Sequence, residues 1–100
     1  MEITQEMIQE WKTKFKFVYR SMNDGTAFYF HPLSRTDYQT ISNKQAANPI
    51  GFDYEMEIVR TCILGEFDES ELKAKSGLIT VLADNIMTKS GFQQLDVEEL

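Results

Sequence analysis

The tripeptide Asn23-Asp24-Gly25 lies between two aromatic stretches, "FKFVYRSM" and "TAFYF". Asn and Gly both tolerate the positive φ angles that a tight two-residue turn requires. In the stretch before the turn, Phe15, Phe17 and Tyr19 alternate with other residues, which is the spacing of a strand. The sequence therefore predicts an antiparallel β-hairpin that closes at Asp24-Gly25, with Thr26–Phe30 as its second strand.

A hairpin of two strands is marginally stable in water on its own, so other segments must cover it. Apolar periodicity and capping residues predict helices for this role. The predicted helices are Thr4 to about Lys14 with Thr4 as N-cap, Arg35 to about Ser42 after the Ser34 cap, Asp53–Leu64 ending at Gly65, and Leu78 to about Lys89 ending near Gly91.

The remaining segments carry turn or charge signals. Residues 43–52, "NKQAANPIGF", read as a loop, and the charged connection that follows Gly65 is expected to hold a short helical turn beginning near Asp68. The acidic tail, residues 93–100, is expected to be flexible. Together these segments predict one α+β domain over residues 1–100, made of an N-terminal helix, a two-stranded antiparallel hairpin and a helical C-terminal half.

Charge and composition limit the classes of function. The net charge is −6, with sixteen acidic side chains against ten basic ones, so a phosphate backbone would be repelled and nucleic acid is not expected as a partner. No stretch has the ~18 apolar residues that a membrane span needs. The single cysteine cannot form an internal disulfide, which favours a reducing compartment.

His31 and Cys62 are the two residues best suited to catalysis or metal binding, and neither has an evident partner. His31 is the only histidine, and Cys62 lies on the apolar face of its predicted helix, beside Ile58 and Val59. A free cysteine in that setting behaves as a small buried hydrophobe. The carboxylates around Glu66–Glu71 lack the ligand order of a calcium loop. We expect no catalytic residue, no cofactor, no metal and no enzymatic activity, and regard His31 as incidental.

The hairpin carries more aromatic side chains than one small core can use. Successive residues of a strand point to opposite faces, so Phe28 and Phe30 share one side and Tyr29 takes the other. We expect Phe28 and Phe30 to pack on the first and last helices. Tyr29 and Val18 would then point outward and, together with Phe92 after the last helix, bind a protein partner.

Three motifs resemble a group of small tailed-bacteriophage proteins, the tail assembly chaperones and the tail or baseplate assembly components. They are "FYFHPLSRTDY" (Phe28–Tyr38), "EIVRTCIL" (Glu57–Leu64) and "SGLITVLADNIMTKSGF" (Ser76–Phe92). The chain departs from the pattern at His31, where arginine is expected, and at Asp37, where glutamate is expected.

The resemblance implies a non-enzymatic protein that binds a phage tail or tape-measure protein, or a second copy of itself, in the host cytoplasm during assembly or as part of the virion. The alternative is a small acidic phage protein that inhibits a host nuclease, polymerase or defence system. An enzyme is a third reading.

Overall fold

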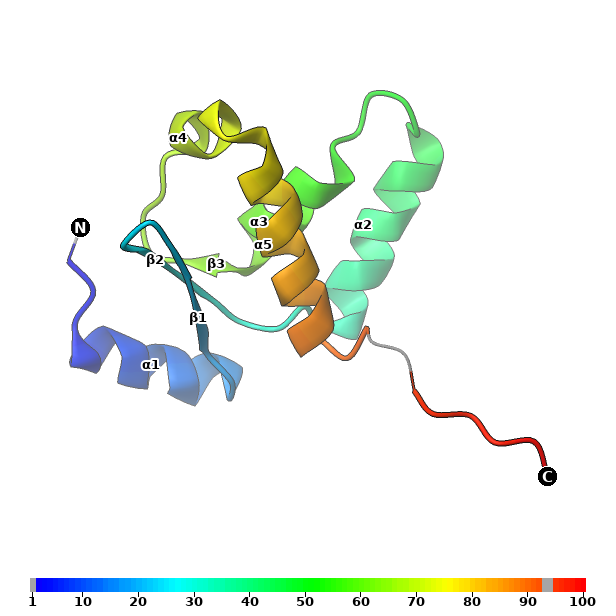
Figure 1. Cartoon of the computed structure of the whole chain (residues 1–100), viewed down its shortest axis with the longest axis horizontal. Coiled ribbons are helices and arrows are strands. Elements are labelled where there is room, and N and C mark those ends of the chain that lie inside the picture. The colour runs from blue at the N-terminus through cyan, green and yellow to red at the C-terminus, as the bar shows by residue number, and fades with distance from the viewer. Residues whose placement is uncertain (1, 93–94) are drawn as a thin grey trace.

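The computed structural model describes residues 2–92 and 95–100, and Figure 1 shows the path of the chain. In chain order the elements are α1 (Gln5–Phe15), β1 (Tyr19–Asn23), β2 (Thr26–Phe30), α2 (Arg35–Ala47), α3 (Tyr54–Cys62), β3 (Ile63–Leu64), α4 (Glu69–Ala74) and α5 (Ser76–Lys89). This is the predicted α+β class, with an N-terminal helix, an antiparallel hairpin and a helical C-terminal half.

The hairpin closes at the predicted turn. Both Asp24 (φ 49°) and Gly25 (φ 78°) have positive φ, and the ladder runs from Asn23↔Thr26 at the turn to Tyr19↔Phe30 at the far end. The first strand starts later than predicted, because the chain is still helical at Phe15 and reverses at Lys16 with φ 71°. Phe17, expected in that strand, precedes it and is half exposed.

A third strand, β3, was not predicted. The sheet order is β1-β2-β3, and β3 pairs antiparallel to β2 through Tyr29↔Leu64 and Phe30↔Ile63. The helix expected to reach Leu64 therefore ends at Cys62, where Ile63 takes extended backbone angles. The N-cap assignments hold, since the Thr4, Ser34 and Asp53 side chains each accept a backbone N–H from the first turn of their helix.

The second helix is longer than predicted. It continues past Ser42 to Ala47, and the loop shortens to residues 48–53. Lys44, Gln45 and the two alanines are good helix formers, so the loop reading of this stretch was wrong. Asn48 ends the helix just before Pro49, and its side-chain oxygen accepts the Gly51 N–H at 3.1 Å.

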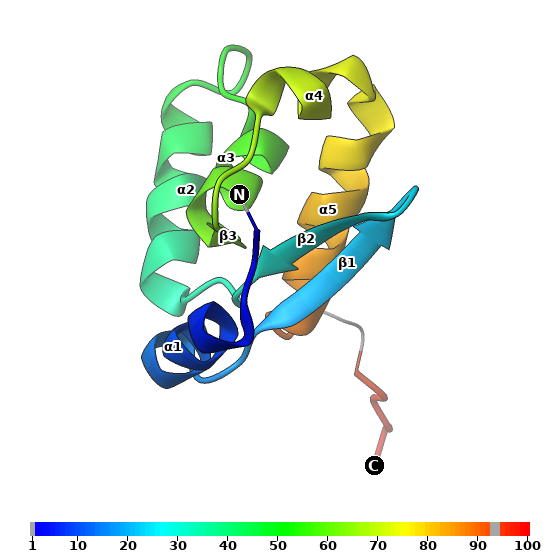
Figure 2. The same cartoon turned by 90° about the vertical axis from the view of Figure 1, so that its left-hand side faces the viewer.

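The core lies between the sheet and the helices of the C-terminal half. Its centre is the contact between α3 and α5, to which Phe30, Leu33, Ile41 and Leu72 add. The buried residues of the two central helices are Met56, Ile58, Val59, Cys62, Ile79, Leu82, Ala83 and Ile86. Figures 1 and 2 show the hairpin between this group of helices and α1.

Helix α1 packs on the other face of β2. Its Trp11 ring lies 5.9 Å from the Tyr29 ring, and its Phe15 ring stacks on His31 at 3.9 Å with only 4° between the planes. Phe28 and Phe30 therefore do not pack on the first helix as predicted, because that helix covers the face to which Tyr29 points. No residue of α1 is fully buried.

The end of α5 ties the C-terminal half to the strand–helix junction after β2. The Ser90 hydroxyl accepts the Leu33 N–H at 2.8 Å and donates to the Ile86 carbonyl at 2.6 Å. Gly91 has φ 95°, and the Phe92 N–H donates back to the Met87 carbonyl at 3.0 Å, which closes the helix as its sequence predicts.

Of the predicted flexible tail, residues 93 and 94 lie outside the described residues, and residues 95–100 are exposed and form no helix or strand. Within the described residues, no helix is both long enough and apolar enough to cross a membrane.

Candidate functional site

One edge of strand β2 is only partly paired, and this open edge is the candidate binding feature of the molecule. Along its length β2 pairs with β1 on one side, but on the other side β3 covers only Tyr29 and Phe30. After Leu64 the chain turns away at Gly65, which has φ 81°. Residues Thr26 to Phe28 consequently have no strand partner on that side within the described part of the chain.

The hydrogen-bond alternation of the ladder shows which backbone groups this leaves open. In an antiparallel pair, successive residues direct their N–H and C=O alternately toward and away from the partner strand. Thr26 faces Asn23 across the two-residue turn, and the His31 N–H donates to the Cys62 carbonyl on the β3 side at 3.0 Å. It follows that Ala27, like Tyr29 and His31, directs its backbone groups away from β1.

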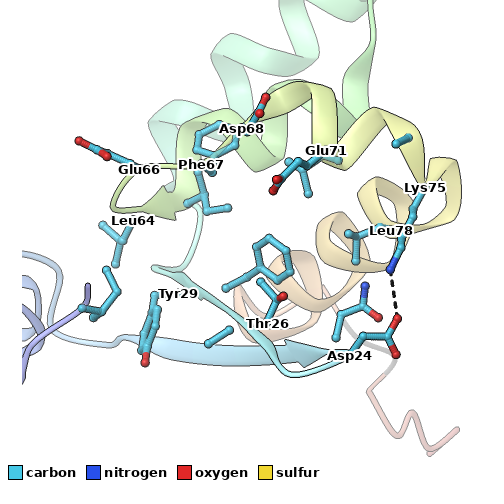
Figure 3. A pocket seen from close by; sticks show the side chains of 17 residues that line it. Asp24, Thr26, Tyr29, Leu64, Glu66, Phe67, Asp68, Glu71, Lys75 and Leu78 are labelled. Carbon is cyan, nitrogen blue, oxygen red and sulfur yellow. Dashed lines mark hydrogen bonds and ion pairs between the residues drawn. The ribbon is translucent and has the colours of Figure 1, made fainter. Parts of the chain in front are cut away.

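A groove of about 560 Å³ lies along this edge. One wall is β2, and the other is the connection from Gly65 to α5, including α4; Figure 3 shows Thr26 and Tyr29 on the first wall and Glu66, Phe67 and Glu71 on the second. The lining is apolar at Phe28, Leu64, Phe67, Leu72 and Leu78, and it is charged at Asp24, Glu66, Asp68, Glu71 and Lys75. We call this site the β2 groove.

Three interactions hold α4 in place as the wall of the β2 groove. Leu72 is 1% exposed and inserts into the core. Arg60 of α3 donates from Nε and Nη2 to the two carboxylate oxygens of Glu69, at 2.6 and 2.9 Å. This paired hydrogen bond lowers the pKa of Glu69 and raises the pKa of Arg60. At the hairpin tip, Lys75 pairs with Asp24 at 3.0 Å.

The three residues predicted to bind a partner do not form one surface. Tyr29 lines the β2 groove but is half-buried, because Trp11 of α1 packs on its ring. Val18 is half-buried in the link between α1 and β1. Phe92 is 40% exposed, lies 4.6 Å from the Tyr38 ring and lines a separate hollow at the end of α5. The Tyr29 ring therefore does not point freely outward as expected, although it reaches a cleft, and partner binding by Tyr29, Val18 and Phe92 stays a prediction.

His31 and Cys62 are both occupied by packing. His31 is buried beneath Phe15, and its Nδ1 donates to the Pro32 carbonyl at 2.8 Å. The expectation that His31 is incidental to function stays a prediction; in the fold, its ring packs on Phe15 and so joins α1 to the sheet. Cys62 has no exposed surface, and burial raises the pKa of its thiol to about 12. Among the described residues, no three His, Cys, Asp or Glu side chains are grouped closely enough to hold a metal ion.

Sequence reasoning missed most of the β2 groove. Ala27 was treated only as part of a strand, and Phe67 and Leu72 were absorbed into a charged connection. A signal was available in that connection, because a short helix begins near Asp68 as predicted, with one apolar residue, Phe67, just before it and another, Leu72, within it. An apolar residue within the first turn of a capped helix indicates that the helix docks on a core rather than crossing solvent.

Comparison with known proteins supports the fold alone. No protein-family model matches the chain, and no curated protein matches it significantly. The chain is similar to a solved structure, that of the uncharacterised protein rbstp2171 from Bacillus stearothermophilus. The TM-score is 0.64 at 20% identity, and the match covers 92% of this chain and 99% of that chain.

Proposed function

We propose that this chain is a non-enzymatic protein of tailed-phage assembly, which binds another structural protein of the phage through the β2 groove. The observation that carries the proposal is the juxtaposition of an unpaired strand edge at Ala27 with the half-buried apolar side chains of Phe67 and Leu78. Exposed backbone groups beside an apolar hollow are a common means of binding a polypeptide.

The partner class comes from the resemblance of three sequence motifs to tail assembly chaperones and to tail or baseplate assembly components. An assembly factor of this kind must hold apolar partner surface until the partner reaches its place in the particle. The β2 groove suits that task, because it offers both hydrogen-bonding edge and apolar lining.

The non-enzymatic part of the proposal rests on how the two most reactive side chains are used. The His31 ring is buried, stacks on Phe15 and donates from Nδ1 to the Pro32 carbonyl, so it is used in packing rather than presented to a cleft. The Cys62 thiol is buried with a raised pKa, and the nucleophilic form of cysteine is the thiolate.

The test is binding between this chain and defined phage proteins. The tail-tube and tape-measure proteins encoded in the same genome would be purified, and their affinity for the chain measured by calorimetry. We expect one of them to bind, and we expect Tyr29→Ala to weaken that binding by ~1–2 kcal/mol, as removal of a buried aromatic contact does. Ile50→Ala is the matched control, because Ile50 is fully exposed and lies outside the β2 groove.

Two results would contradict the proposal. If no structural protein of the phage binds, the assembly role is wrong. If a purified host nuclease or polymerase binds instead and loses activity, the inhibitor alternative is correct.

A further inference from the structure

We infer that the β2 groove binds an extended partner segment that adds to the open edge of β2 as a strand and carries lysine or arginine beside apolar side chains. The inference rests on the proposed function and specifies the chemistry of the partner. It follows from three properties of the groove, namely its backbone edge, its apolar wall and the charge of its rim.

At the backbone edge, one residue has both its N–H and its C=O available to a partner strand. Ala27 directs its N–H and C=O into the β2 groove, in line with the position that β3 would occupy if it continued beyond Leu64. Because Gly65 turns the chain away there, a partner strand entering the groove meets no steric continuation of β3. A segment paired with Ala27 would extend the sheet by the same ladder that β3 begins.

The apolar wall receives alternate side chains of such a segment. Phe67 and Leu78 are half-buried and line the groove on the side opposite the strand edge (Figure 3). In a strand, every second side chain points to the same face, so a segment with alternating apolar residues would place them against this wall. This requirement excludes a uniformly polar partner.

The rim favours basic residues in the remaining positions. Four carboxylates and one ammonium line the β2 groove, and the ammonium of Lys75 is already paired with Asp24. The Asp68 carboxylate accepts the Ser70 N–H at the start of α4. Glu66 and Glu71 are exposed and form no ion pair within the described part of the chain.

A lysine or arginine of the partner could therefore form an ion pair with Glu66 or Glu71, whereas an acidic segment would be repelled by them. The chain's own acidic tail, with Asp96, Glu98 and Glu99, is disfavoured as an occupant on the same ground.

The probe for this inference is a short, end-blocked synthetic peptide in which lysine and valine alternate, with a glutamate–valine peptide of equal length as its charge control. Binding to the full chain would be followed by NMR, together with amide hydrogen exchange of Ala27 and Met22. We expect the lysine peptide to bind and to slow exchange at Ala27. The Met22 amide should not change, because it lies on the opposite, outer edge of the hairpin.

Two proline variants locate the binding edge. Ala27→Pro removes the N–H that faces the β2 groove and leaves the bonds between β1 and β2 in place, since proline is tolerated where the N–H faces solvent. Met22→Pro is the matched control, because Met22 is the cross-strand partner of Ala27 and its N–H also points away from the ladder. We expect Ala27→Pro to weaken peptide binding about five- to tenfold, the effect of one lost hydrogen bond, and Met22→Pro to leave it unchanged.

Each contrary outcome has a distinct meaning. Equal binding of the glutamate peptide overturns the basic partner, and protection of Met22 in place of Ala27 overturns the choice of edge. Failure of both peptides to bind overturns the inference. A tail protein that binds Ala27→Pro as tightly as wild type would likewise overturn strand addition while leaving the proposed function intact. A lysine peptide that binds as expected while no tail protein binds would instead refute the proposed function.

Discussion

Replacing Leu72 by alanine tests whether α4 is a docked wall of the β2 groove. Leu72 is the only buried residue that α4 contributes, and it is 1% exposed. The truncation removes an isopropyl group, which at ~0.8 kcal/mol per buried carbon is worth roughly 2 kcal/mol in transfer free energy. The cavity left behind adds to the loss, but a six-residue helix at the surface can settle inward. We therefore expect unfolding to become easier by ~2–3 kcal/mol.

Urea unfolding followed by the fluorescence of Trp11, the single tryptophan, measures this loss. The midpoint should fall while the dependence of the unfolding free energy on urea stays the same, because the fold is unchanged. Lys73→Ala is the matched control on the exposed side of α4, and it should stay within ~0.5 kcal/mol of wild type. A loss below ~1 kcal/mol for Leu72→Ala would refute the docking of α4, and with it the apolar wall.

Three further predictions concern the turn, the buried thiol and the histidine stack. Gly25→Val should destabilise the fold by about 1 kcal/mol or more. The cost comes from backbone strain at φ 78° and not from a clash, since a Cβ at this position meets no neighbouring atom. An unchanged Tm would contradict the turn. Burial raises the pKa of Cys62 from 9.0 to about 12. The free energy of unfolding should therefore fall as pH rises through this interval, by up to ~1.4 kcal/mol per pH unit. The same pH titration of Cys62→Ala should show a shallower fall. His31→Gln removes the stack with Phe15 and should cost ~1 kcal/mol in urea unfolding while leaving peptide binding at the β2 groove unchanged; wild-type stability would show that the stack does not anchor α1.

Local chemistry made much of the fold predictable. The hairpin follows from Asp24-Gly25, whose positive φ angles few other pairs adopt. The starts of three helices follow from Thr4, Ser34 and Asp53, whose side chains accept the free N–H groups of the first turn. These features depend on residues within a few positions of one another, so the sequence displays them directly.

Contacts between distant segments were not predictable in the same way. The face of the hairpin that α1 covers is decided by the reversal at Lys16, a non-glycine residue at φ 71° that gives no signal in the sequence. With α1 expected on the other face, the packing of Tyr29 and His31 was not foreseen. Both contacts have the same origin, since Trp11 and Phe15 of α1 pack on those two side chains.

The same limitation explains why the candidate site was missed. Ile63 and Leu64 continue an apolar helical pattern, so periodicity favours helix through Leu64. In the fold, they leave the helix at Cys62 to pair with Tyr29 and Phe30, and Gly65 then turns the chain away. A longer β3 would have covered Ala27, and a helix through Leu64 would have left the β2 edge without its first partner. The two-residue strand thus extends the sheet and stops short, and a free edge next to Phe67 and Leu72 is the consequence.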